Sequence, residues 1–158
     1  MEYMSKADDA AGGCIFCDQL AEDDDEFARI LYRGPAAFVI LNAFPYNTGH
    51  LMIAPRRHVG ELVDTRADER RELMDLTSSA VEIIRSAMDP HGFNIGINLG
   101  QVAGAGIPGH LHIHVVPRWG GDTNFMPVVG QTKVLPEMLA DTYAKLRPGF
   151  DALGPRPA

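Results

Sequence analysis

Cysteine and basic residues are both scarce in this chain. Its 158 residues include two cysteines, and 14 lysines and arginines face 21 acidic residues, which gives a net charge of −7. A nucleic-acid partner is not expected, because a phosphate backbone requires a basic surface. The N-terminus lacks the basic-then-apolar pattern of a signal peptide, and no apolar run approaches the roughly 20 residues of a membrane span. We therefore expect a cytoplasmic protein without a membrane partner.

The chain also lacks internal repeats and any low-complexity linker that would separate domains. Its length, with 46% hydrophobic and 22% charged residues, fits one compact globular domain. We expect a flexible leader over residues 1–13, a single domain over 14–147 and a flexible, Pro- and Gly-rich tail over 148–158.

The most informative stretch covers residues 109–117, GHLHIHVVP, in which histidines alternate with aliphatic residues. This period of two predicts a strand with Leu111, Ile113 and Val115 facing a core. His110, His112 and His114 would then form a row on the exposed face, about 6.6 Å apart.

Half of the six histidines fall on this one strand, so an ordinary edge strand with incidental histidines is a weak explanation. Two chemical roles remain, a metal site of the His-x-His type and nucleophilic or hydrogen-bonding work by imidazoles near neutral pH. No Asp or Glu lies next to the triplet, which disfavours the commonest metal-hydrolase patterns.

Hydrophobic patterning predicts further strands over residues 30–32, 38–41, 50–55 and 93–99, with the first two joined in a hairpin. A long helix is expected over 67–88, capped by Asp64 and Thr65 and stopped by the Asp89–Gly92 segment. Its charged positions, Glu69 and Glu72 among them, should lie largely off the buried stripe. A second helix is expected over 133–146.

Two further segments allow more than one interpretation. Cys14 and Cys17 form a CxxC pair, which is half of a zinc site or a redox pair, and the acidic run over 22–26 that follows is most simply a solvated loop. The loop over 100–109 holds four glycines and is either a flexible hairpin or an anion-binding concavity. Its position immediately before the histidines favours phosphate.

The HLHIHVV sequence resembles the signature of the histidine triad (HIT) superfamily, in which histidines alternate with hydrophobic residues. The resemblance extends to the segments GHLMIAPRRHV, HGFNIGINLG and HVVPRWGGDTNF, the last two being typical of members that act on diadenosine tetraphosphate. It implies an α+β fold, an antiparallel sheet of about five strands with one long helix and a C-terminal helix, and a homodimer.

The same resemblance implies the roles of individual residues. His112 would be the nucleophile, His114 and His50 would contact phosphate or support it, and Asn42 would hold the ribose. From the residues themselves, we expect the phosphates to be bound by the glycine loop together with a few polar side chains. The expected substrate-binding residues beyond Asn42 are Asn98, Gly104, Gly106, Gly109 and Arg118.

The resemblance also completes the metal site, because a histidine of the P-x-x-H element and the first triad histidine join the CxxC in some members. The implied ligands are Cys14, Cys17, His58 and His110. Such a closed Cys₂His₂ set is typical of structural zinc. No organic cofactor is expected.

The implied activity is nucleotidyl transfer or hydrolysis at the α-phosphate of adenine nucleotides. We expect phosphorolysis of diadenosine tetraphosphate to ADP and ATP, with inorganic phosphate as the second substrate. The alternatives are hydrolysis of dinucleoside polyphosphates or phosphoramidates, and a non-catalytic nucleotide-binding protein. Gly106-Ile107 stands where many relatives have Ser, Thr or Gln, which weakens the phosphoramidate alternative.

Overall fold

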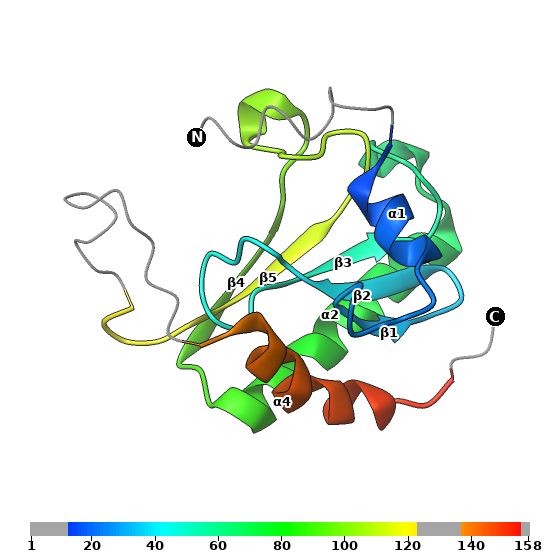
Figure 1. The fold of residues 1–158 in the computed structure, drawn as a ribbon. Helices are drawn as coiled ribbons and strands as arrows, with labels where there is room; N and C mark the ends of the chain where they lie inside the picture. Colours follow the sequence, from blue (N-terminus) through cyan, green and yellow to red (C-terminus); the bar gives the residue numbers. More distant parts are fainter. Residues whose placement is uncertain (1–12, 123–136, 156–158) are drawn as a thin grey trace.

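The computed structural model describes residues 13–122 and 137–155, which form an antiparallel five-stranded sheet with helices on both faces (Figure 1). The strands are β1 (Ile30–Arg33), β2 (Ala37–Leu41), β3 (Leu51–Pro55), β4 (Gly92–Ile97) and β5 (Ile113–Arg118), in the order β1-β2-β3-β5-β4. The expected β1–β2 hairpin is present, and the expected α+β fold is confirmed.

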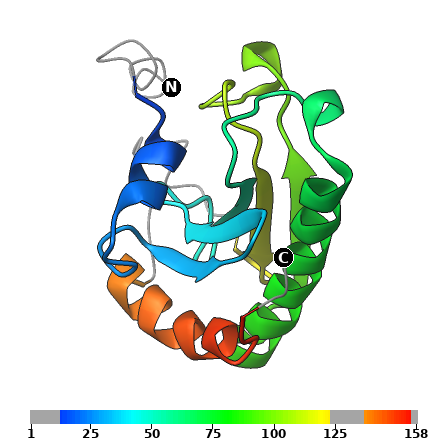
Figure 2. The same ribbon diagram turned by 90° about the vertical axis from the view of Figure 1, so that its right-hand side faces the viewer.

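Alternation along the central strands gives the sheet two apolar faces. Val39 and Leu41 of β2 face α2 (Ala67–Met88) and α4 (Leu139–Asp151), whereas Phe38 and Ile40 join a second cluster that contains Phe16 of α1 (Ile15–Ala21). Figure 2 shows α2 and α4 wrapped around one side of the sheet, with α1 on the other. Short 3₁₀ helices, η2 (Leu62–Asp64) and η3 (Gln101–Ala103), lie in the connections. None of the helices described is long and apolar enough to span a bilayer.

Helix α2 has the predicted bounds but different polar contacts at its start. Arg66 occupies the N-cap, and its N–H donates to the Glu69 carboxylate at 2.7 Å, so the expected Asp64–Thr65 cap is wrong. Glu69 and Glu72 are buried rather than off the stripe. Arg57 forms a bidentate pair with Glu69, while Glu72 accepts backbone N–H groups of the β1–β2 turn. Both carboxylates therefore tie loops to α2.

The C-terminal helix α4 spans Leu139–Asp151, so it ends later than the predicted residue 146. Pro148 lies inside its last turns, and Phe150 is fully buried in the core. The expected tail is therefore wrong for residues 148–151, because the apolar stripe of the helix continues past the proline. The start of the expected helix before residue 137 and the leader over residues 1–12 lie outside the described residues.

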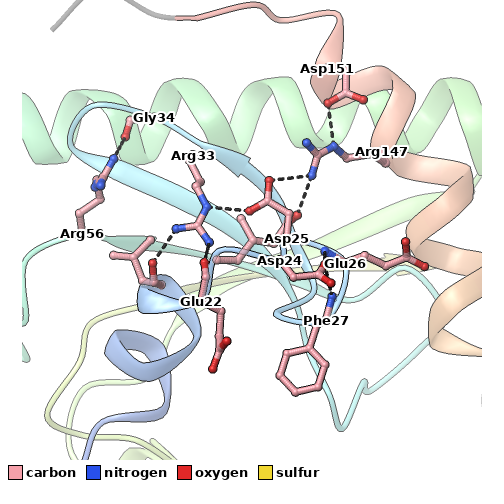
Figure 3. Close-up of polar contacts among 12 residues, drawn as sticks. Glu22, Asp24, Asp25, Glu26, Phe27, Arg33, Gly34, Arg56, Arg147 and Asp151 are labelled. Atoms are coloured by element: carbon pink, nitrogen blue, oxygen red, sulfur yellow. Dashed lines mark hydrogen bonds and ion pairs between the residues drawn. The ribbon is translucent and has the colours of Figure 1, made fainter.

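The acidic run is a compact turn, not a simple solvated loop (Figure 3). Asp24 accepts the N–H groups of Glu26 and Phe27, both at 3.0 Å. Asp25 forms ion pairs with Arg33 of β1 and Arg147 of α4, at 2.7 and 3.0 Å. These hydrogen bonds hold the pKa of Asp25 below its usual value although burial opposes the shift. The turn is thus fixed from both sides.

Candidate active site and metal centre

The three triad histidines are buried, so their expected position on an exposed face is wrong. Their side chains are between 0% and 8% exposed. His110 and His112 precede the first residue of β5, Ile113, and Phe16 of α1 packs on both imidazoles with ring centroids 5.1 and 5.0 Å away. The alternation is nevertheless retained, since Leu111, Ile113 and Val115 lie in the core cluster under α2. The sequence interpretation did not predict α1, which covers the face of the sheet that carries the histidines.

His110 turns away from the other two histidines into a cluster with Cys14, Cys17 and His58. The four ligand atoms lie within 4.8 Å of one another. Cys14 Sγ is 3.3 Å from His110 Nδ1, and Cys17 Sγ is 3.5 Å from His58 Nδ1. A tetrahedral zinc ion places neighbouring S and N ligands about 3.5 Å apart. The four residues predicted as ligands are therefore brought together, and they can hold a metal ion.

The surroundings of the cluster fit a metal centre as well. His110 Nε2 lies 2.8 Å from the Pro55 carbonyl oxygen and donates its proton there, so Nδ1 carries the lone pair that faces the sulfurs. Burial and the neighbouring Cys14 raise the pKa of the Cys17 thiol to about 11. A bound divalent cation reverses this effect, because it stabilises the thiolate.

His112 and His114 line a cavity of about 280 Å³ between α1 and the sheet. Three of the expected substrate-binding residues line it too, namely Asn42, Gly104 and Gly106. Most of the remaining lining is apolar, and α1 and β2 contribute Ile15, Phe16, Ile40 and Leu41 to it. The cavity is thus a largely apolar slot with imidazoles at one end.

The contacts of His112 fix which of its nitrogens is reactive. Its Nδ1 lies 2.8 Å from the carbonyl oxygen of His110, an acceptor only, so Nδ1 must carry the proton. Nε2 then holds the lone pair. The backbone carbonyl of His110, a member of the Cys₂His₂ cluster, therefore sets the tautomer of His112, the candidate nucleophile.

A second hydrogen-bond chain fixes the tautomer of His114. The Tyr46 N–H donates to His50 Nδ1 at 2.9 Å, so the His50 proton is on Nε2. His50 Nε2 lies 2.9 Å from His114 Nδ1 and donates to it. The proton of neutral His114 is therefore on Nε2, which can donate to a ligand oxygen. Asn42 Nδ2 also approaches His50 Nδ1, at 3.3 Å.

Burial keeps both cavity histidines neutral. It lowers the pKa of His112 and, together with the charge of His112, lowers the pKa of His114 to about 4. Near pH 7 one end of the cavity therefore offers a nucleophilic nitrogen beside an N–H donor. The two rings lie edge to face with centroids 4.8 Å apart.

Only some residues of the glycine loop line the cavity that holds His112 and His114. Gly104 adopts a positive φ of 90°, and its N–H donates to the Gln101 carbonyl. Gly106 and Ile107 line the cavity, and their N–H groups have no partner among residues 13–122 and 137–155. Asn98 supports the loop by donating to the Gly104 carbonyl at 3.3 Å. Gly109 lies beside His58, at the metal cluster.

Arg118 is not brought to the histidine cavity. It lies at the far end of β5, where its guanidinium forms a bidentate pair with Asp122 and donates to Asn94. These residues line a separate hollow of about 290 Å³, which shares Tyr46 with the first. The positive charge of Arg118 is therefore balanced by Asp122.

The sequence interpretation missed several side chains that contact the triad or line its cavity, Phe16, Tyr46, Gln19 and Arg29 among them. Phe16 covers two triad histidines, Tyr46 stacks on His114 with centroids 5.7 Å apart, and Gln19 and Arg29 line the cavity. The apolar pair within CIFC was the only signal for α1, and a seven-residue helix is too short for a periodicity argument.

Comparison with protein-family models matches residues 25–121, more than half of the chain, to the HIT domain. The chain belongs to the HIT domain family. The resemblance seen in the triad sequence is confirmed by this match.

Similar proteins include enzymes of dinucleotide metabolism. The chain is 47% identical over 124 residues to the AP-4-A phosphorylase of Mycobacterium tuberculosis, an alignment that covers 78% of this chain and 64% of that protein. It is 30% identical over 95 residues to the asymmetrical bis(5′-nucleosyl)-tetraphosphatase of Schizosaccharomyces pombe, covering 60% and 52%. The match thus spans less than two thirds of either relative.

A solved structure of a zinc-bound histidine triad family protein from Mycobacterium smegmatis superimposes with a TM-score of 0.72. It is 25% identical, and the superposition covers 89% of this chain and 95% of that one. The HIT fold expected from the resemblance is therefore confirmed.

Proposed function

We propose that this chain transfers a nucleotidyl group through His112, with diadenosine tetraphosphate as substrate and inorganic phosphate as acceptor. The observation that carries the proposal is the fixed tautomer of His112, whose Nε2 lone pair lies in the cavity beside the N–H donor of His114. A neutral imidazole is a competent nucleophile.

In the first step Nε2 of His112 attacks the α-phosphorus, and the bond to the bridging oxygen breaks. ATP departs as a stable anion and needs no proton from the site. His112 then carries AMP on Nε2 and the proton on Nδ1, and the His110 carbonyl stabilises the resulting positive charge. His114 Nε2–H and the N–H groups of Gly106 and Ile107 are the donors available for phosphate oxygens.

In the second step an oxygen of inorganic phosphate attacks the same phosphorus, and the P–N bond breaks. The electron pair returns to Nε2, and ADP is released beside the ATP of the first step. The likeness to the AP-4-A phosphorylase supports phosphate as the acceptor. The tetraphosphatase relative supports the alternative, in which water is the acceptor and AMP replaces ADP.

The test is the product set from diadenosine tetraphosphate with and without phosphate in the buffer. Phosphorolysis gives equal amounts of ADP and ATP that depend on phosphate, and ³²P-labelled phosphate should enter the β-position of ADP. AMP and ATP formed at the same rate in both buffers would make the protein a hydrolase. Tight binding of nucleotide with no turnover in either buffer would favour a non-catalytic binding protein.

We also propose that the Cys₂His₂ cluster holds one structural zinc ion. All four ligand atoms converge, and the donor set leaves no position for a substrate. The zinc-bound family member gives further support. Elemental analysis of the purified protein should give one zinc per chain and almost none in Cys17→Ser. Equal metal content in both proteins would refute this assignment.

A homodimer through β4 is proposed for the exposed edge of the sheet. Ile95 and Leu99 are 49% and 42% exposed, and Val102 is fully exposed, although all three are apolar. Such a patch beside an unpaired edge strand favours an interface between copies of the chain. Light scattering should give twice the chain mass, and Ile95→Asp should reduce it to the monomer. A monomeric wild-type protein would exclude this interface.

A further inference from the structure

Two polar side chains that line the cavity each have one buried atom without a hydrogen-bond partner among the described residues. Gln19 Oε1 and Arg29 Nε are both buried, and neither has a partner among residues 13–122 and 137–155. Burying such groups without partners is unfavourable, because the hydrogen bonds they made to water in the unfolded chain are lost. Both residues line the same apolar cavity as His112 and His114. A ligand in the cavity would supply the partners once the two side chains rotate toward it, because neither atom is accessible to solvent in the conformation described.

The sheet places Arg29 far from the reacting phosphorus. Arg29 immediately precedes Ile30 of β1, and Ile30 lies in one cross-strand row with Ile40, Met52 and His114. Because β1 and β5 are separated by two strands, their backbones are about 14 Å apart. Asn42, expected at the ribose, follows β2 between them. Along the sheet the order is therefore histidines, Asn42, then Arg29, while Gln19 lines the cavity from α1, one helical turn beyond Phe16.

The backbone also holds Arg29 in an uncommon conformation. Its φ of 59° lies in the left-handed region, which side chains other than Gly, Asn and Asp seldom adopt. The acidic turn enforces this conformation, since the Arg29 N–H donates to Glu26 O and the next N–H to Asp25 O. Figure 3 shows the same turn tied to Arg33 and Arg147 through Asp25. Arg29 thus lines the cavity from a turn whose backbone is fixed by hydrogen bonds and ion pairs.

We propose that Gln19 and Arg29 read the edge of the base and select adenine; the assignment rests on the proposed function, which places a nucleotide in this cavity. Gln19 Oε1 accepts a hydrogen bond, and the Arg29 guanidinium only donates. Adenine presents the complement, because its exocyclic amino donor lies next to ring-nitrogen acceptors. Guanine presents a carbonyl oxygen and a protonated N1 at these positions. The Gln19 amide can rotate to donate to the carbonyl, but the N1–H then faces the Arg29 guanidinium, which only donates.

The experiment compares the binding of AMP, GMP and purine riboside 5′-monophosphate, which lacks the amine, by calorimetry. The wild-type protein should bind AMP about 10- to 100-fold more tightly than the other two. Gln19→Leu should reduce the preference for AMP over the amine-free nucleotide to nearly 1. Arg29→Met should weaken the binding of AMP and of the amine-free nucleotide together, about 10-fold.

Three controls separate base reading from general damage. Arg71→Met removes an exposed arginine of α2 and should leave all three affinities unchanged. Gln19→Glu keeps the acceptor and should retain the preference for AMP over the amine-free nucleotide. Arg29→Lys keeps the charge without the planar guanidinium, so it should recover only part of the affinity.

The outcomes distinguish this inference from the proposed function. Unchanged nucleotide preferences in Gln19→Leu and Arg29→Met, with turnover intact, would overturn base reading and leave the catalytic proposal standing. A preference that depends on both residues in a protein without turnover would support base reading and reject the catalytic proposal. A wild-type protein that binds none of the three nucleotides would overturn both.

Discussion

His110 and His112 are two residues apart, yet they serve two different environments. His110 enters a cluster in which every ligand atom faces another ligand atom of the chain, so its site is closed by the protein itself. His112 enters a cavity whose lining leaves a lone pair and several donors available. One strand segment thus supplies both a structural anchor and a reactive group.

The two sites are physically joined. Phe16 lies between Cys14 and Cys17 and packs on both His110 and His112. The cluster therefore fixes α1, and α1 forms one wall of the cavity through Ile15, Phe16 and Gln19. The difference between the sites shows how a closed cluster can position an open cavity without taking part in its chemistry.

The sharpest way to separate the two sites is His112→Ala. Loss of the nucleophile should reduce turnover of diadenosine tetraphosphate by at least about 10³-fold. Zinc content should stay at one per chain, because the His110 side chain and its Pro55 contact are untouched. Steady-state kinetics and elemental analysis on the same preparation check both statements. A variant that kept near-wild-type turnover would rule out His112 as the nucleophile.

Removing a ligand of the Cys₂His₂ cluster should lower the stability of the protein. Cys17→Ser is expected to lose the metal and, because structural zinc contributes directly to folding, to destabilise the protein by about 3 kcal/mol or more. Thermal unfolding should shift down by about 10 °C. His112→Ala, which keeps the metal, is the control and should unfold close to the wild-type temperature. An unshifted midpoint in Cys17→Ser would show that α1 is held by packing alone.

Local patterns predicted much of the fold and of the site. The period-two alternation found the strands, the 3.6-residue stripe found α2 with its bounds, and the triad resemblance found all four members of the cluster. These features succeed because each depends on neighbouring residues along the chain or on a specific motif.

The failures concern groups whose environment is set by distant segments. Glu69 was expected off the buried stripe, but its side chain is buried and pairs with the partly exposed Arg57 of the loop that follows β3. Exposure of the histidines was mistaken because α1 was not predicted. Arg118 was expected among the phosphates, but the sequence does not reveal that Asp122 neutralises it at the other end of β5. Tertiary contacts, not local propensity, decide these positions.

The pH dependence of the free energy of unfolding tests whether the cavity around His114 is desolvated. His114 has a pKa of about 4 against a usual 6.5, so folding favours its neutral form. Its contribution is therefore complete above pH 6.5 and is lost as the pH falls toward 4, by about 3 kcal/mol. His114→Gln should lose correspondingly less stability over this range in urea unfolding. His50, His112 and the cluster remain in both proteins, so equal pH slopes would contradict the burial effect.

The smallest effect is expected for Arg118→Met, which tests whether the second hollow belongs to the phosphate site. Arg118 lies four residues beyond His114 on β5, a separation of about 13 Å along the strand, and Asp122 already balances its charge. An exposed ion pair of this kind contributes little to stability, because water screens its charges. Turnover and its dependence on phosphate concentration should therefore change less than about threefold. If the phosphate concentration needed for half-maximal rate instead rose tenfold, Arg118 would be a ligand of the acceptor phosphate. Such a rise requires that the Arg118 guanidinium leaves Asp122 and pairs with the phosphate.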